Sequence, residues 1–136
     1  MAHLKAKLST RSPYWISEHR YYELKHYCLQ YPEWKKLYLS LSPDPVRHAN
    51  IAVKHMPSDH TEELAIQRAE LKRNIDLIER VALSLDQALG PYILKAVTEN
   101  IPFKTLQMIY GIPCGKDLYY DNYRKFFRRL SEEKGL

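Results

Sequence analysis

The run from Thr61 to Leu89 constrains the fold of this chain more than any other feature, because no glycine or proline interrupts it. Apolar residues recur along it in alternating steps of three and four, with Arg68 as the one polar break. This spacing predicts a helix of roughly 25 residues with one apolar stripe. The stripe comprises Leu64, Leu71, Ile75, Ile78, Ala82, Leu85 and Leu89, and it is widened by Leu77 and Val81.

Such a stripe can be covered in two ways. It can form one half of a homodimeric coiled coil, or it can be a spine against which the rest of the chain packs. The stripe is wider than a strict coiled-coil seam and the chain is short, which favours the spine. In the dimer interpretation, the contact residues are Leu64, Leu71, Ile75, Ile78 and Leu85.

Aromatic residues gather at the two ends of the chain and are absent between residues 42 and 91. Tyr21, Leu24 and Cys28 recur at helical spacing, so we expect a helix over 17–31 that begins at an N-cap, Ser17. Pro32 ends that helix and starts a second one over 33–41. Residues 1–41 are therefore predicted to form an aromatic helical hairpin.

The remaining chain divides into a linker over 42–60, the long central helix over 61–90 and a C-terminal region over 91–136. In the C-terminal region a helix over 92–99 is followed by a short helix over 103–110, a tight turn at Gly111-Ile112-Pro113 and a longer helix over 115–133. This order is typical of a helix-turn-helix, whose second helix can lie in the major groove of DNA. The fold class is all-α.

Apolar spacing also predicts which side chains of this region point inward. They are Leu106, Ile109 and Tyr110 in the short helix, and Leu118, Tyr119, Tyr123, Phe126, Phe127 and Leu130 in the longer one.

The net charge is +5, with the basic excess at the two ends and a slightly acidic middle. A polyanionic partner such as DNA would therefore contact the ends. The alternatives are that the basic residues form the solvated face of a core helix, or a protein-binding surface. The predicted DNA contacts are Lys104, Lys116, Tyr120, Asn122, Arg124, Lys125, Arg128 and Arg129.

No signature of an enzyme, a metal or a cofactor stands out. The six histidines lack cysteine or carboxylate neighbours at the spacing of a zinc site, and phosphate-binding, nucleophile-elbow and metalloprotease motifs are missing. We expect Cys28 and Cys114 to be reduced thiols, with the pKa of Cys114 lowered at a helix start. Without a secretory signal or a long apolar run, a cytoplasmic protein is expected.

The spacing of Leu106, Ile109, Gly111, Ile112 and Leu118 resembles the helix-turn-helix in the last region of bacterial sigma factors. The stretch GIPCGKDLYYDNYRKFFRRL is also similar to phage late-gene transcriptional regulators of the RinA and ArpU group, over about residues 61–130. The chain departs from the sigma-like pattern at Lys116, where serine or threonine is usual, and at Asp117, where an apolar residue is usual.

This resemblance implies a phage or prophage regulator that binds double-stranded DNA in the bacterial cytoplasm, with RNA polymerase as a further partner. The rival hypothesis is a non-enzymatic interaction or phage assembly factor that keeps the helix-turn-helix as a scaffold.

Overall fold

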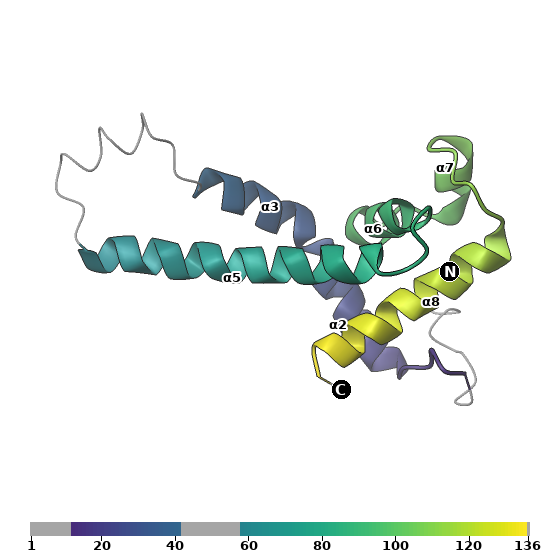
Figure 1. Ribbon diagram of the computed structural model, residues 1–136, viewed down its shortest axis with the longest axis horizontal. Coiled ribbons are helices and arrows are strands. Elements are labelled where there is room, and N and C mark those ends of the chain that lie inside the picture. Colours follow the sequence, from purple (N-terminus) through teal and green to yellow (C-terminus); the bar gives the residue numbers. More distant parts are fainter. Residues whose placement is uncertain (1–11, 42–57, 136) are drawn as a thin grey trace.

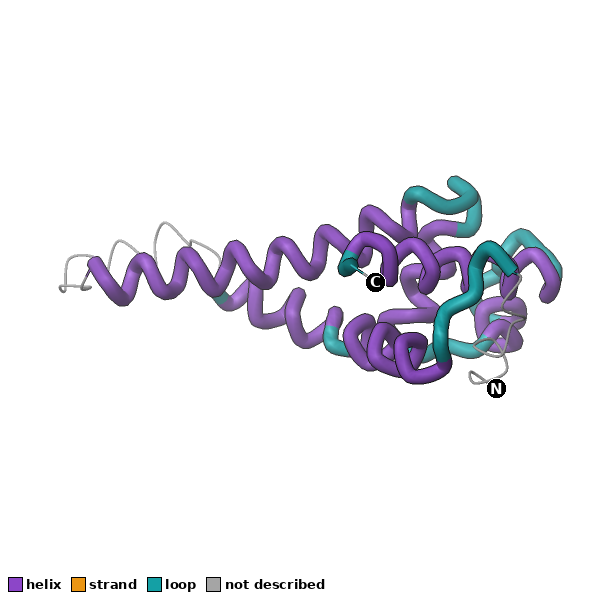
Figure 2. Tube along the Cα trace, turned by 90° about the horizontal axis from the view of Figure 1, so that it is seen from below, coloured by secondary structure: helices purple, strands orange, loops and turns teal. Residues whose placement is uncertain are grey.

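The computed structural model describes residues 12–41 and 58–135, with 58–60 placed only as part of a helix. These residues form six α-helices and no strand, so the all-α prediction is confirmed for the described chain. Figure 1 shows α5 as a long rod, with α3 beside its first half and the other helices grouped around its second half. Seen from below in Figure 2, the molecule tapers from this helical body to a narrow arm. The arm consists of α3 and the N-terminal half of α5.

Helix α5 spans Ser58–Leu83 and is the spine predicted from the apolar stripe. Its second half enters the body, where Ile75 and Ile78 are buried, whereas Ile66 in the first half is 60% exposed. The dimer assignment was wrong for four of its five residues, because the single chain already covers these side chains in its own core. These four are Leu71, Ile75, Ile78 and Leu85, while Leu64 in the arm is only partly buried.

Helices α2 (Glu18–Leu29) and α3 (Tyr31–Ser40) do not form the expected hairpin. Only Gln30 separates them, and its backbone is itself right-handed helical, so the chain bends instead of reversing. Pro32 explains the bend, since it has no N–H to donate to the preceding turn. As a result α3 packs along α5 and α2 packs against α6 and α8. The rest of the predicted hairpin and most of the predicted linker, 1–11 and 42–57, lie outside the described residues.

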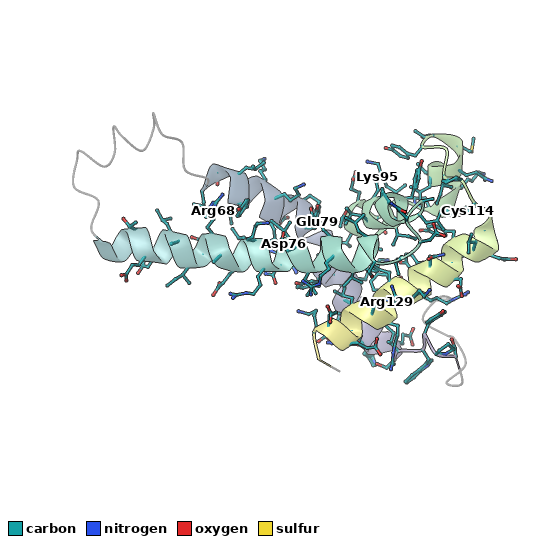
Figure 3. The ribbon with its side chains drawn as sticks, in the orientation of Figure 1. Arg68, Asp76, Glu79, Lys95, Cys114 and Arg129 are labelled. Carbon is teal, nitrogen blue, oxygen red and sulfur yellow. The ribbon has the colours of Figure 1, made fainter. Side chains whose placement is uncertain are left out.

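The predicted N-cap of α2 is confirmed, because the Ser17 side chain accepts a hydrogen bond from the backbone N–H of Arg20 at 3.2 Å. Helix α2 buries Tyr21, Leu24 and Cys28 as expected. Helix α3 buries only Tyr31, and Leu37 is 41% exposed on the arm. At the arm the guanidinium of Arg68 lies 4.1 Å from the ring centre of Tyr38, so the polar break in the stripe faces an aromatic ring of α3 (Figure 3).

Helix α6 (Gly90–Glu99) returns along α5 after a short connection that begins at Ser84. A Cβ atom at Gly90 would lie 2.9 Å from the carbonyl oxygen of Ala82, so the close approach of the two helices requires glycine there. Asn100 ends α6 with a left-handed backbone (φ 56°), a conformation that asparagine tolerates. Helix α6 buries Ile93, Ala96 and Val97.

Helix α8 (Lys116–Glu133) is a central element of the body, packed against α2, α5 and α6. Phe126, Phe127 and Leu130 are almost completely buried. The hydroxyl groups of Tyr21 and Tyr123 lie 2.7 Å apart in the core, and the rings of Tyr21 and Phe127 meet edge to face at 5.0 Å. The aromatic residues of the two chain ends therefore build one joint core.

Candidate nucleic-acid interface

The start of α8 meets the short helix α7 (Phe103–Met108) at one end of the molecule, and we call this region the α7–α8 corner (Figure 1). The ring of Phe103 lies 5.0 Å from that of Tyr119 and 6.3 Å from that of Tyr120. Leu106, which was predicted to point inward, is completely buried. The corner is thus anchored by Phe103 and Leu106, one at the start and one in the second half of α7.

The connection between the two helices is not the predicted tight turn. It covers residues 109–115, whereas the turn of a helix-turn-helix usually has about three or four residues. Gly111 has a left-handed backbone (φ 65°), which lets the chain fold back so that the N–H of Ile112 donates to the carbonyl of Leu106 at 3.1 Å. Ile112 is buried, so this fold-back is fixed by packing as well.

Two of the predicted DNA contacts, Lys104 and Lys116, are exposed at the corner. Lys104 lies in the first turn of α7 and Lys116 is the first residue of α8. The N-cap of α8 is Gly115, which offers no side chain to bond the free backbone N–H groups of the first turn. Uncapped N–H groups at a helix start are suited to an anion such as phosphate.

The side chains next to this first turn add charges of both signs. Asp117 is exposed in the first turn of α8, and Asp121 is partly exposed one turn later. A carboxylate near phosphate lowers affinity, although it can also accept a hydrogen bond from a cytosine amine. Tyr120, another predicted contact, is half-buried with its ring 4.9 Å from that of Tyr119.

Three predicted DNA contacts are instead engaged within the protein. Asn122 is 5% exposed and donates its side-chain amide to the carbonyl of Leu118 at 2.9 Å. Arg129 donates to the carbonyl oxygen and the hydroxyl of Ser84, just past the end of α5 (Figure 3). Arg128 donates to the carbonyl of Trp15 at 2.9 Å and pairs with Glu132. Asn122 thus bonds within α8 itself, whereas Arg128 and Arg129 bond to the turn before α2 and to the end of α5.

Arg124 and Lys125, the last two predicted contacts, lie at the boundary and are partly exposed. The Lys125 ammonium group is 5.8 Å from the ring centre of Tyr14, in the turn before α2. The Nε of Arg124 is buried and makes no hydrogen bond with any residue that the structure describes. Arg124 and Lys125 therefore add positive charge along α8. With Arg128 and Arg129 engaged elsewhere, they do not form a continuous basic surface that could enter a DNA groove.

The corner also exposes large apolar side chains that the sequence pattern missed. Met108 and Ile109 are each 72% exposed, Leu118 is 49% exposed and Tyr110 is 42% exposed. Ile109, Tyr110 and Leu118 were predicted to point inward, and these predictions were wrong. Helix α7 ends at Met108, so helical spacing no longer places the next two residues. Leu118 falls in the first turn of α8, beyond the elements that cover its later turns.

Burial is the main cause of the pKa shifts in this region. It raises the pKa of Tyr119 and of Tyr123, so both hydroxyls are neutral at ordinary pH. It also raises the pKa of the Cys114 thiol, and nearby Asp86 acts in the same direction. The lowered pKa expected for Cys114 at a helix start was therefore wrong, and this thiol is not activated as a nucleophile.

The described residues contain no group of three or more histidine, cysteine or carboxylate side chains placed to hold a metal ion. Within the same residues, every helix is too short or too polar to cross a lipid bilayer. Cys28 and Cys114 are both free thiols, as expected.

No known protein family, curated protein or solved structure matches this chain. The assignment of function therefore rests on the geometry of its own residues.

Proposed function

We propose that this protein is a DNA-binding transcriptional regulator that contacts duplex DNA through the α7–α8 corner. The observation that carries the proposal is the open first turn of α8, which has no side-chain cap and is accompanied by exposed Lys116 and Lys104. Contact between Phe103 and Tyr119 holds the starts of the two helices together, so both exposed lysines lie at the same end of the molecule. A phosphate at the helix start would accept from backbone N–H groups and be neutralised by the lysines.

In this proposal the two halves of α8 have different tasks. The first half, with Lys116, Tyr120, Arg124 and Lys125, meets DNA, while the second half anchors the helix in the core through Phe126 and its neighbours. Arg128, Arg129 and Asn122 support the structure and do not read bases. Contact by one end of a helix positions the protein on the sugar–phosphate backbone more than it selects a sequence.

The resemblance to RinA and ArpU regulators supports the biological context that we propose. In this context the protein is phage-derived, acts in the bacterial cytoplasm and works with RNA polymerase. If the regulator acts as a homodimer, the central seam is not the contact, because Ile75 and Ile78 are buried in one chain. The arm offers a surface in its place, where Leu39 is 67% exposed and Ile66 is 60% exposed.

A salt titration of binding to duplex DNA tests the proposal. For each phosphate contact, the logarithm of affinity falls with the logarithm of salt concentration by about 0.9. The variant Lys104→Gln/Lys116→Gln should therefore bind more weakly, with a salt slope smaller by about 2. The matched control is Lys36→Gln/Arg73→Gln, which removes the same charge from exposed residues of α3 and α5 and should leave the slope unchanged.

If both double variants lost the same DNA affinity, binding would depend only on the net charge of the protein, and the proposal would fail. Binding by the parent chain that does not weaken with salt would also contradict it.

A second candidate function follows from the exposed apolar residues of the same corner. Met108, Ile109 and Leu118 would suit a protein partner, because contiguous exposed apolar side chains mark interaction surfaces. In that case the variant Ile109→Ser/Leu118→Ser would lose binding to RNA polymerase, and Lys104→Gln/Lys116→Gln would keep it. DNA binding that survives the serine variant but not the glutamine variant assigns the corner to DNA.

A further inference from the structure

Three large apolar side chains follow one another at the end of α7, and we call Met108, Ile109 and Tyr110 the apolar tip. No large apolar side chain in the described ranges is more exposed than Met108 and Ile109. Figure 1 shows α7 at an outer corner of the helical body. The tip is therefore an apolar protrusion, which fits a partner that opens to receive it.

The apolar tip is held in place on both sides by buried residues. Leu106 precedes the tip and is completely buried, and Ile112 follows it and is also buried. The N–H of Ile109 donates to the carbonyl of Thr105 at 2.9 Å, and the N–H of Ile112 donates to the carbonyl of Leu106 at 3.1 Å. The backbone of the tip is thus fixed before any partner arrives, which lowers the entropic cost of binding.

The charge around the apolar tip favours a polyanionic partner. Between Glu99 and Asp117 the chain carries two lysines, Lys104 and Lys116, and no carboxylate. Both lysines are exposed. Lys104 precedes Met108 by four residues on α7, so the two side chains lie on the same side of that helix. The apolar protrusion is therefore accompanied by positive charge that is suited to phosphate.

The other charged groups of this region add little to that positive charge. The ammonium group of Lys95 lies 4.7 Å from the ring centre of Tyr110, but it is also paired with Glu99 at 3.2 Å. Asp117 is exposed beside Lys116 at the start of α8 and offsets part of its charge. Lys104 has no carboxylate within four residues of it in the sequence, so its charge is the less compensated of the two.

Phosphate contact explains the lysines of the corner but not the exposed apolar side chains beside them. Proteins that bend DNA insert side chains such as Met and Ile between base pairs from the minor groove, next to basic residues on the backbone. A helix that lies in the major groove needs a long open face. Helix α8 lacks such a face, because Arg128 and Arg129 are bonded to Trp15 and Ser84. A short protrusion can instead enter the narrower minor groove.

We propose that the apolar tip is a wedge that opens a base step of duplex DNA. Met108 and Ile109 insert from the minor groove, and Lys104 and Lys116 bind phosphates next to the opened step. Insertion unstacks the step and bends the duplex toward the major groove. The inference rests on the proposed DNA binding, and it adds that the protein changes the shape of the DNA. Burial of the two side chains offsets the unstacking, so the affinity for intact duplex changes little.

Energy transfer between dyes at the two ends of a duplex of about 30 base pairs measures the bend. The full chain at saturation should bring the ends closer, with a bend of about 20–90°. Met108→Ser/Ile109→Ser should bind this duplex with an affinity within about threefold of the parent and the same salt slope, but should leave it straight. Both side chains are mostly exposed, so this variant should remain folded.

The arm provides a matched control for the tip. Leu39→Ser/Ile66→Ser removes two exposed aliphatic side chains from α3 and α5, and it should leave both the affinity and the bend unchanged. Lys104→Gln/Lys116→Gln should weaken binding and keep the bend once the duplex is saturated. Loss of bending in one variant and loss of affinity in another would separate the wedge from the phosphate contacts.

A duplex with one mismatched base pair gives a second readout, because stacking at the mismatch is already weak. The parent chain should bind it at least about tenfold more tightly than the fully paired duplex, since part of the unstacking is already done. Met108→Ser/Ile109→Ser should bind the two duplexes with affinities within about threefold of each other. A fluorescent adenine analogue beside the mismatch should brighten on binding of the parent and not of this variant.

Salt-dependent binding by the parent that leaves the duplex straight would overturn the wedge and keep the proposed function. An equal bend with the parent and with Met108→Ser/Ile109→Ser would also overturn it. If that variant then failed to bind RNA polymerase, the tip would be assigned to a protein partner. A parent chain that does not bind duplex DNA would overturn the wedge and the proposed function together.

Discussion

The two halves of α8 carry similar residues, basic and aromatic side chains in alternation, but they occupy different surroundings. The second half lies against α2, α5 and α6, and its arginines bond to Trp15 and to Ser84. The first half packs Tyr119 against Phe103 of α7 and Tyr123 against Tyr21 of α2, but it leaves Lys116 and Leu118 exposed. A basic residue on a helix thus becomes a binding residue or a structural one according to the elements around it. Four measurements test the difference between the two halves.

The largest effect is expected from removing a large side chain of the anchored half. Phe126→Ala should lower the free energy of unfolding by about 3–5 kcal/mol, because the buried ring leaves a cavity. Leu118→Ala in the open half should change it by only about 0.5 kcal/mol. Denaturant unfolding of the two variants checks this, and similar losses in both would remove the distinction between the halves.

The next effect is a loss of stability at alkaline pH. Burial raises the pKa of Tyr21 to about 12 from its ordinary value of 10.0. The folded state therefore holds the proton more tightly than the unfolded state, so this contribution is present below pH 10.0 and is lost as the pH rises toward 12. Thermal unfolding measured across this range should show a falling midpoint. The fall should be shallower in Tyr21→Phe/Tyr123→Phe, and an equally steep fall would show that other groups cause it.

The hydroxyl pair between α2 and α8 should give a smaller effect with a distinct pattern. Tyr123→Phe should cost about 1–3 kcal/mol, because the buried hydroxyl of Tyr21 loses its partner. The double variant Tyr21→Phe/Tyr123→Phe should recover part of that loss, since no polar group is then left unpaired. A double-mutant cycle by denaturant unfolding measures the coupling, and strictly additive losses would contradict the pairing.

The smallest effects are expected from single charge removals on α8, which should change either the free energy of unfolding or the DNA affinity, but not both. Arg129→Gln should lower the free energy of unfolding by about 1 kcal/mol through the lost bonds to Ser84, and it should leave DNA affinity unchanged. Lys116→Gln should do the opposite, with weaker DNA binding and a stability change within about 0.5 kcal/mol. Calorimetric unfolding and a DNA-binding titration on the same samples measure both quantities. If Arg129→Gln weakens DNA binding as strongly as Lys116→Gln does, the division of α8 into two halves is wrong.

Regular spacing explains why much of the fold could be predicted. The long helix, the N-cap at Ser17 and the buried stripe of α2 each follow from local rules of helix geometry. Local rules also identified the buried rings of α8. They failed at Ile109 and Leu118, because spacing describes which side of a helix is apolar and not whether another element covers that turn.

The candidate interface was less predictable for the same reason. Lys104 and Lys116 are exposed as expected, but Arg128 and Arg129 are engaged by Trp15 and Ser84, which are distant in the sequence. Nothing in the residues around Arg128 indicates that the turn before α2 would reach it.

The sequence by itself determined that this chain is helical, where most helices run and which faces are apolar, because these depend on contacts within a few residues. Only the packing of distant segments shows that Ile75 and Ile78 of the central stripe lie in the core of the single chain. The same packing shows that the chain bends between α2 and α3 near Pro32. It also shows that the first turn of α8 is exposed to solvent. These outcomes depend on which surfaces compete for the same apolar face, and that competition takes place between residues far apart in the chain.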